Sequence, residues 1–268
     1  MALERSLSTD WLGSDPVFYN TKTGAISRSM HEVIDFEDLE FDSEGFNNYL
    51  DFGYAVFEQT PVKHVKFLRH SSQVMRKDDG SLEVTHHDDP VADRLSGTGD
   101  VDAALERIEG SVRAWEAAQE GDIVIPTSGG FDSRMLNVCI EDSSRVRSFT
   151  YGTSDDQKQS SEVAYARELS QILGTRWEQI ELGDYHQYMS EWDDLFGAST
   201  HAHGMYHIEF YRKILAKTGP GRPLLSGIIG DAWAGSVVLE PITDTGGLRA
   251  LGYSHGMHAD SSFSLLMS

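Results

Sequence analysis

The sequence predicts an α/β fold, a doubly wound parallel sheet preceded by a small, strand-rich α+β segment. From residue 101 onward, short apolar runs alternate with longer helical patterns, as in a sheet of parallel strands joined by helices. Before residue 90, short β-rich pieces surround a single helical pattern. In the second part, a glycine-rich turn at 128–133 separates the first apolar run from the helical pattern that follows.

The strand-rich segment is expected to span residues 1–95. An Asp-Gly turn at 78–80 lies between two β-rich runs and predicts a hairpin. The polar stretch at 86–102 is expected to link this segment to a second domain at 100–268. The elements expected in the first segment are strands at 17–19, 62–69, 72–75 and 82–85 and a helix at 45–52.

The second domain is expected to hold the alternating strands and helices. Ile108, Val112 and Trp115 recur at helical spacing and predict an amphipathic helix. Gly174 follows a later helical pattern and is expected to end that helix. The expected elements are strands at 123–126, 147–151, 177–182 and 224–229 and helices at 101–118, 132–140, 160–173, 184–196 and 208–217.

The composition of the 268 residues excludes several classes of protein. Asp and Glu number 43 against 22 Lys and Arg, which gives a formal net charge of −21. That charge repels nucleic acids and anionic membranes, so we expect neither as a main partner. No apolar run has the roughly 18 residues of a membrane helix, and the N-terminus lacks a signal-peptide pattern. We therefore expect a soluble, cytoplasmic protein.

The turn at 128–133 carries the clearest chemical signal. Its sequence is Ser128-Gly129-Gly130-Phe131-Asp132-Ser133. Two adjacent glycines let backbone amides approach an anion, and the following helix adds its N-terminal amides and the positive end of its dipole. Ser128 and Ser133 add hydroxyl groups, while Asp132 suits a Mg²⁺ ion that bridges phosphates. The turn predicts a nucleotide-phosphate site, with an ordinary strand-to-helix turn as the alternative.

The turn resembles the pyrophosphatase loop, Ser-Gly-Gly-x-Asp-Ser, of the N-type ATP pyrophosphatase (PP-loop) superfamily. Within that superfamily, asparagine synthetase and its relatives look most similar. Ser148-Phe149-Thr150-Tyr151-Gly152 resembles the second strand of the family, whose end borders the adenine. Ser226-Gly227-Ile228-Ile229-Gly230-Asp231 resembles its Ser-Gly-x-Gly-x-Asp-Glu segment. The resemblance covers about residues 100–250.

The resemblance implies a sheet of the adenine nucleotide α-hydrolase-like type that uses ATP and Mg²⁺. Asp132 and Asp231 would be the catalytic residues and the Mg²⁺ ligands. The residues that would bind the nucleotide are Ser128, Gly129, Gly130, Asp132, Ser133, Thr150, Tyr151, Gly152, Ser226 and Gly227.

The implied activity is that of an ATP-dependent, AMP-forming ligase. A substrate carboxylate would attack the α-phosphate to give an acyl-adenylate and pyrophosphate, and an amine or ammonia would then displace AMP to form an amide. The expected partners are a small-molecule carboxylate or peptide, an amine or ammonia donor, and either a second copy of the chain or a partner protein that completes the site.

The chain departs from asparagine synthetases at several positions. Residues 15–90 weakly resemble the end of their amidotransferase half, but the glutaminase of that half needs an N-terminal cysteine. This sequence begins Met1-Ala2-Leu3 and its single thiol is Cys139, which we expect to be a buried hydrophobe. We therefore expect no glutaminase activity.

Other departures concern the proposed catalytic machinery. Ile228 and Ala232 stand where asparagine synthetases carry glutamate, and no lysine follows Lys217. The alternative function is therefore a truncated, non-catalytic relative that binds nucleotide or acts as a scaffold and needs a partner. A tRNA-modifying enzyme is a third alternative, disfavoured by the net charge of −21.

A histidine-rich stretch precedes the last expected helix. His203 and His207 are four residues apart, which would place them on one face of a helix, and His201 precedes them. Gly204 weakens such a helix, and no glutamate lies between the two histidines as in the His-Glu-x-x-His pattern. We expect this stretch to line the substrate side of the nucleotide cleft, with a transition-metal site or a surface loop as alternatives.

Overall fold

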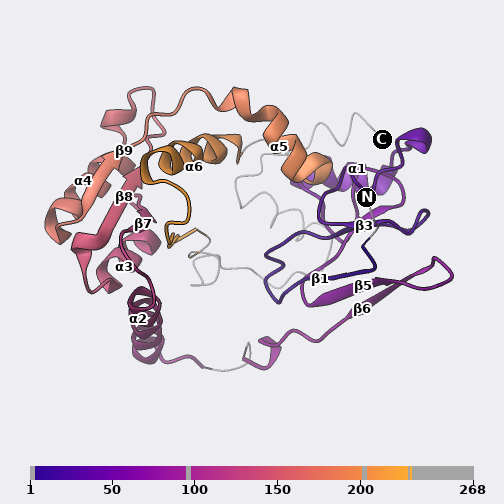
Figure 1. Ribbon diagram of the computed structural model, residues 1–268, viewed down its shortest axis with the longest axis horizontal. Coiled ribbons are helices and arrows are strands. Elements are labelled where there is room, and N and C mark those ends of the chain that lie inside the picture. The colour runs from indigo at the N-terminus through magenta and orange to yellow at the C-terminus, as the bar shows by residue number, and fades with distance from the viewer. Residues whose placement is uncertain (1–3, 95–97, 201–203, 229, 231–268) are drawn as a thin grey trace. The chain divides into compact units, whose positions relative to one another are not determined.

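A computed structural model describes residues 4–94, 98–200, 204–228 and 230 of the chain. These residues fall into two compact units (Figure 1). The first, here called the N-terminal unit, ends at Gly97 and also takes in Met189–Gly204. The second, the sheet unit, comprises Thr98–Tyr188 and the described residues from Met205 onward. The first boundary lies near the expected one, but the assignment of Met189–Gly204 to the N-terminal unit was not expected.

The N-terminal unit contains two antiparallel sheets of three strands each. The hairpin expected at 78–80 joins β5 to β6, and Gly80 adopts a φ of +85° in its turn. Two strands were not expected, because runs of two or three residues show no alternation. The strands are β1 (Ser6–Ser8), β5 (Ser72–Arg76) and β6 (Leu82–His86) in one sheet, and β3 (Ile26–Ser27), β2 (Phe18–Asn20) and β4 (Val65–Phe67) in the other.

Two helices belong to the N-terminal unit. Helix α1 (Ser43–Phe52) begins where the Asp42 carboxylate accepts a hydrogen bond from the Gly45 amide, and it ends at Gly53 in the left-handed conformation. Helix α5 (Met189–Phe196) is shorter than the helix expected at 184–196, because 185–188 form a 3₁₀ turn. The amide of Ala55 donates to the carbonyl of Ser199, which explains why the segment around α5 belongs to this unit.

The sheet unit is built on a parallel sheet of three strands in the order β7-β8-β9. Parallel neighbours require crossover connections, and helices supply them. None of the helices in the described part of the chain is long and apolar enough to cross a bilayer. The elements are β7 (Ile123–Pro126), β8 (Val146–Thr150) and β9 (Arg176–Gln179), with helices α2 (Val101–Ala117), α3 (Phe131–Cys139), α4 (Ser161–Leu173) and α6 (Met205–Thr218).

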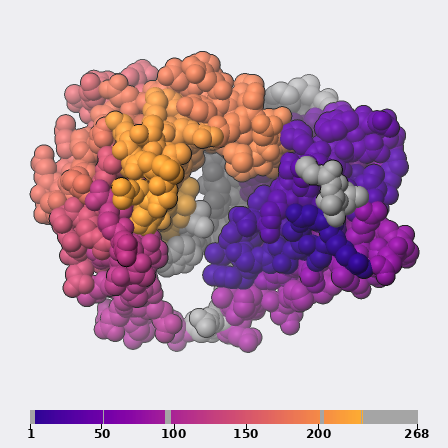
Figure 2. All heavy atoms as spheres, in the orientation of Figure 1, coloured from indigo at the N-terminus to yellow at the C-terminus, as the bar shows by residue number. Residues whose placement is uncertain are grey.

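Helices pack against both faces of this sheet. Ile123 and Ile125 of β7 face a core that includes Val112 of α2 and Cys139 of α3. Val124, between them, faces the opposite core with side chains of α6. Because successive side chains of a strand point to opposite faces, the continuous apolar run of β7 is explained by burial on both sides. In Figure 2, α6 and the chain that follows it, coloured orange to yellow, lie on the visible face of the sheet unit.

A further segment meets β7 along its free edge. The amide of Val124 donates to the carbonyl of Pro223 at 2.9 Å, and the amide of Leu225 donates to the carbonyl of Val124 at 3.0 Å. The result is one parallel bridge between Val124 and Leu224; of the strand expected at 224–229, the described residues 225–228 are not in a strand. β8 occupies the other edge of β7. The strands therefore follow in order to one side of β7, and the chain returns later to its other side. The doubly wound sheet remains a prediction.

A buried carboxylate joins two connections at the end of the sheet where β7 and β8 begin. Glu116 is 4% exposed, and it accepts hydrogen bonds from the amides of Glu141 at 2.7 Å and Asp142 at 3.0 Å. Nearby, the Arg145 guanidinium donates to the carbonyl of Gly121 at 2.8 Å. The C-terminal end of α2 is thereby fixed to the turn that follows α3.

Substitution of Glu116 by Gln is expected to destabilise the fold. The amide group can accept through one oxygen only, and its NH₂ group then faces a backbone donor. A buried donor without a partner costs about 1–3 kcal/mol, so the free energy of unfolding should fall by that amount. Urea denaturation measures it, with the exposed Glu120→Gln as the control, expected within about 0.5 kcal/mol of the wild type. Equal midpoints for the two variants would contradict the role of Glu116.

Candidate functional site

The loop at 128–133 is folded back on a buried serine. Ser133 is 6% exposed, and its Oγ accepts a hydrogen bond from the amide of Ser128 at 3.0 Å. The amide of Gly130 donates to Ser128 Oγ at 3.1 Å. Gly130 is the N-cap of α3 and gives it no side-chain hydrogen bond. The first turn of α3 therefore begins without a side-chain cap, which is the arrangement that suits an anion.

A layer of buried polar side chains holds this loop on the strand ends. Asn137 Nδ2 donates to Thr127 Oγ1 at 3.0 Å and to the carbonyl of Ser133 at 2.8 Å. Thr150 Oγ1 donates to the carbonyl of Thr127 at 2.5 Å and accepts from Trp177 Nε1 at 3.0 Å. One chain of contacts thus links α3 to the ends of β7 and β8 and to Trp177 within β9. Of these residues, only Ser133 and Thr150 were expected from the sequence. The polar Asn137 on the inward face of α3 is the feature of the sequence that could have indicated the others.

A pocket of about 210 Å³ opens at this end of the sheet. It is lined by most of the residues expected to bind nucleotide. Those residues are Ser128, Gly130, Asp132, Ser133, Thr150, Tyr151, Ser226 and Gly227. The structure thus brings together three segments that are far apart in the sequence, at the carboxyl ends of parallel strands, where open α/β sheets bind ligands.

Two of the expected binding residues, Gly129 and Gly152, do not line the pocket. A Cβ on Gly129 would lie 2.9 Å from Cδ2 of Tyr165, a residue of α4. A Cβ on Gly152 would lie 2.7 Å from Cα of Gln157. Gly129 and Gly152 are therefore explained by close approach between parts of this chain, and neither borders the pocket.

The segment around Gly227 packs directly on the first turn of α3. A Cβ on Gly227 would lie 2.8 Å from the Ser133 nitrogen, and one on Gly230 would lie 2.5 Å from Cγ of Asp132. The glycines of this segment are thus required for contact with the loop. Asp231 lies outside the described residues, so its expected pairing with Asp132 on Mg²⁺ remains a prediction.

Aromatic side chains form the other wall of the pocket. Tyr151, at the end of β8, meets Phe210 edge to face, with ring centroids 4.9 Å apart. Its hydroxyl lies 3.4 Å from Nε2 of His207. Burial, with Tyr206 as the next cause, raises the pKa of Tyr151 well above its ordinary value of 10, so the phenol is neutral. Tyr211 also lines the pocket, and neither it nor Phe210 was singled out from the sequence.

His207 is one of the three histidines singled out from the sequence, and it lines the pocket. His201 and His203 lie outside the described residues. Among the residues that the structure describes, no group of three or more His, Cys, Asp or Glu side chains is placed to hold a metal ion.

The charged groups at the pocket are acidic. Asp132 and Glu162 are the carboxylates among its described lining residues, and no lysine or arginine occurs in that set. A hydrogen bond from its own backbone amide is the main cause that lowers the pKa of Glu162, and the Ser161 and Thr153 hydroxyls add to it. Asp155, in the connection after β8, is exposed and does not line this pocket. An anion bound here would depend on backbone amides, hydroxyl groups and an added cation.

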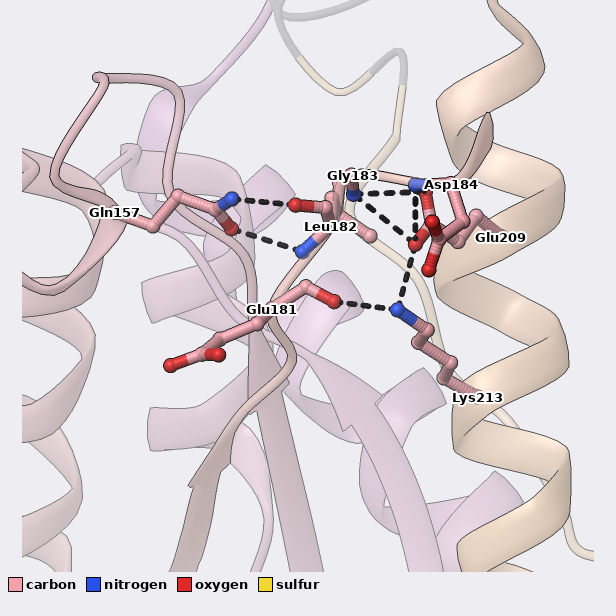
Figure 3. A network of polar contacts seen from close by, with 7 residues as sticks. All are labelled: Gln157, Glu181, Leu182, Gly183, Asp184, Glu209 and Lys213. Carbon is pink, nitrogen blue, oxygen red and sulfur yellow. Dashed lines mark hydrogen bonds and ion pairs between the residues drawn. The ribbon is translucent and has the colours of Figure 1, made fainter. Parts of the chain in front are cut away.

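Behind the aromatic wall lies a network centred on the buried Glu209 (Figure 3). Its carboxylate accepts hydrogen bonds from the amide of Gly183 at 3.1 Å and from that of Asp184 at 3.1 Å. Lys213 Nζ donates to it at 2.6 Å. Gln157 joins the same loop through Leu182. The network connects α6 with the loops that follow β8 and β9.

No protein-family model matches this chain, and no curated protein matches its sequence. Among solved structures, the chain is similar to glutamine-dependent NAD+ synthetase from Acinetobacter baumannii in complex with ADP, with 17% identity and a TM-score of 0.36. That match covers 68% of this chain and 34% of the synthetase chain. It is also similar to NH3-dependent NAD synthetase from Campylobacter jejuni subsp. jejuni NCTC 11168 in complex with the nitrate ion, with 14% identity and a TM-score of 0.34 over 60% of this chain and 75% of that one. Similarities this low assign neither a fold nor an activity to this chain.

Substitution of Asn137 by Ala is expected to loosen the loop on the strand ends. It removes two hydrogen bonds and leaves the buried Thr127 hydroxyl with one partner fewer, so the free energy of unfolding should fall by about 1–3 kcal/mol. A double-mutant cycle with Thr127→Val, followed by urea denaturation, isolates the contact between the two side chains. A coupling energy of zero would show that this contact does not hold the loop.

The network also predicts a pH dependence of stability. Burial raises the pKa of Glu209, but Lys213 and the amides of Asp184 and Gly183 outweigh burial and hold the pKa below the ordinary 4.5. Such a carboxyl adds stability above its unfolded pKa and loses that contribution as the pH falls through its folded pKa. The stability difference between wild type and Glu209→Gln should therefore be constant near neutral pH and narrow below about pH 4.5. Urea denaturation across this range tests the expectation, and a constant difference would contradict it.

Proposed function

We propose that the sheet unit binds Mg²⁺-ATP and activates a substrate carboxylate as an acyl-adenylate, which an amine or ammonia then converts to an amide. The observation that carries this proposal is the meeting of the 128–133 loop, the end of β8 and Ser226-Gly227 at one pocket. The same three segments carry the sequence resemblance to asparagine synthetases of the PP-loop superfamily. A glutaminase activity is no part of the proposal, because Cys139 is buried.

The phosphate groups would lie against the loop at 128–133. The uncapped first turn of α3 offers backbone amides and the positive end of the helix dipole, and Ser128 offers a hydroxyl. Asp132 is half-buried at the pocket and has the oxygen ligands that Mg²⁺ prefers, so its chemistry fits the ion. We propose Asp231 as the second ligand. The ion would neutralise phosphate charge where the described lining has no cationic side chain.

The base of the nucleotide would lie against the aromatic wall. Tyr151, His207 and Phe210 present ring surfaces that suit a flat heterocycle. The phenol of Tyr151 is neutral, so this wall contributes shape and apolar surface without charge.

In the proposed reaction, a carboxylate oxygen of the substrate attacks the α-phosphorus as the bond to the bridging oxygen breaks and pyrophosphate leaves. The nitrogen of the amine or ammonia then attacks the acyl carbon, AMP leaves and the nitrogen loses a proton. The chain would hold the reacting groups in line and stabilise charge on the phosphates. The acid can be a small molecule or a peptide, and a second copy of the chain or a partner protein can complete the site.

A non-catalytic nucleotide-binding relative is the second candidate. Ile228 lines the pocket with 59% of its surface exposed, at a position where asparagine synthetases carry glutamate. An apolar side chain cannot replace a carboxylate in binding an amine or a proton. Binding of Mg²⁺-ATP without release of pyrophosphate, over a panel of carboxylic acids, would favour this candidate.

Substitution of Asp132 by Asn is expected to weaken Mg²⁺-ATP binding at least about tenfold, because the ion loses a charged ligand. Asp102→Asn is a matched control, since Asp102 lies in the first turn of α2 as Asp132 does in α3, but does not line the pocket. Calorimetric titration measures the affinity and a pyrophosphate-release assay measures the reaction. Absence of ATP binding by the wild type, or equal binding by Asp132→Asn, would overturn the proposed site.

A further inference from the structure

We propose that Glu209 is a positioning residue of the nucleotide pocket, which fixes α6 so that its aromatic side chains form the pocket wall. This inference rests on the proposed function, because the readout is nucleotide affinity. Glu209 does not line the pocket; it acts through the helix that carries His207, Phe210 and Tyr211.

The carboxylate of Glu209 is fully buried and surrounded by donors. Each of its oxygens lies 3.1–3.2 Å from the amide nitrogens of Gly183 and Asp184, and Oε1 also lies 2.6 Å from Lys213 Nζ. Lys213 donates in turn to the carbonyl of Glu181 at 2.7 Å. Two residues of α6, one turn apart, therefore hold positions 181, 183 and 184 of a loop near the carboxyl end of β9 (Figure 3).

Gln157 holds the same loop from the other side. Its Nε2 donates to the carbonyl of Leu182 at 2.6 Å, and its Oε1 accepts from the amide of Leu182 at 2.9 Å. Because both backbone groups of Leu182 are paired, Gln157 fixes the orientation of the loop as well as its distance from the connection after β8. Gln157 belongs to the connection after β8, where its backbone packs against Gly152. The loops after β8 and β9 and helix α6 thus form one hydrogen-bonded assembly.

The same assembly reaches the pocket through apolar contacts. Leu182 packs against the core cluster that contains Phe210, and Tyr151 packs against it as well. His207, Phe210 and Tyr211 have the i, i+3, i+4 spacing of one helix face, while Glu209 lies on a neighbouring side. A rotation or slide of α6 would therefore move the Glu209 carboxylate off the amides and the aromatic rings off Tyr151 together.

A buried carboxylate stabilises a helix only weakly, because the free-energy cost of its desolvation offsets much of the favourable energy of its hydrogen bonds and ion pair. Apolar packing would hold α6 on the sheet at lower cost but would not select one rotation of the helix, whereas directed hydrogen bonds do. The location of the charge beside a pocket-forming helix therefore indicates a role in the geometry of the pocket.

Glu116 provides a matched comparison within the same unit. It too is a buried glutamate that accepts hydrogen bonds from two successive backbone amides, those of Glu141 and Asp142. It lies at the end of the sheet where β7 and β8 begin, and it does not line the pocket. Glu209→Gln and Glu116→Gln are the same chemical change at opposite ends of the strands.

The experiment measures urea midpoints and Mg²⁺-ATP affinity by calorimetry for the full chain and the variants Glu209→Gln, Gln157→Ala and Glu116→Gln. All three should lower the midpoint. Glu209→Gln and Gln157→Ala should weaken nucleotide binding at least about fivefold, which corresponds to about 1 kcal/mol, and Glu116→Gln should leave it within about twofold.

The outcomes separate the two proposals. No binding by the wild type would refute the proposed function itself. Binding by the wild type that is unchanged in Glu209→Gln, or weakened equally in Glu116→Gln, would overturn the positioning role. Gln157→Ala leaves Glu209 in place and loosens the same loop. When Glu209→Gln does not fold, unchanged nucleotide binding by Gln157→Ala would overturn the positioning role.

Discussion

The site depends on one hydrogen-bonded turn, in which the buried Ser133 hydroxyl accepts from the amide of Ser128 while its carbonyl accepts from Asn137. This closes the 128–133 loop over the first turn of α3 and leaves that helix start without a side-chain cap. Gly227 can then approach the Ser133 backbone more closely than any other residue could. A change that opened the turn would separate the loop from the segment around Gly227, and the pocket would lose the walls that these two segments form.

The charge of the protein would make phosphate binding at the pocket depend on backbone groups. The protein carries a formal net charge of −21, and the carboxylates of Asp132 and Glu162 line the pocket without a lysine or arginine in its described lining. A phosphate group would meet repulsion there unless neutral dipoles and a cation supplied the attraction. The uncapped helix start, the serine hydroxyls and the proposed Mg²⁺ ion serve that need together. The acidic composition and the type of loop are thus consistent parts of one solution.

Local patterns predicted the centre of the site, and only its centre. Neighbouring residues predict β7, the glycine turn and the start of α3. The signals are an apolar run, two glycines and a change to the helical spacing of apolar residues. The contacts of Asn137 with Thr127 and of Glu209 with Gly183 join residues that no local pattern connects. Strands β1 and β3 are too short to show alternation, and 224–229 looks like a full strand, but its described residues, 224–228, bridge β7 only at Leu224. Their positions follow from tertiary packing.

The path of the chain gives a reason for a charged tether on α6. The chain leaves the sheet unit after Tyr188, contributes Met189–Gly204 to the N-terminal unit, and returns with α6 at Met205. Helix α6 therefore starts directly after a segment that belongs elsewhere, and a short connection from the sheet does not set its position, as it does for α3 directly after β7. Side chains must supply that constraint. Phe210 and Ile214 hold the helix to the sheet face, and the Glu209 carboxylate, with two amides and Lys213, selects its rotation. The loop after β9 thus positions the aromatic wall of the pocket, although the aromatic side chains come from α6 and the end of β8.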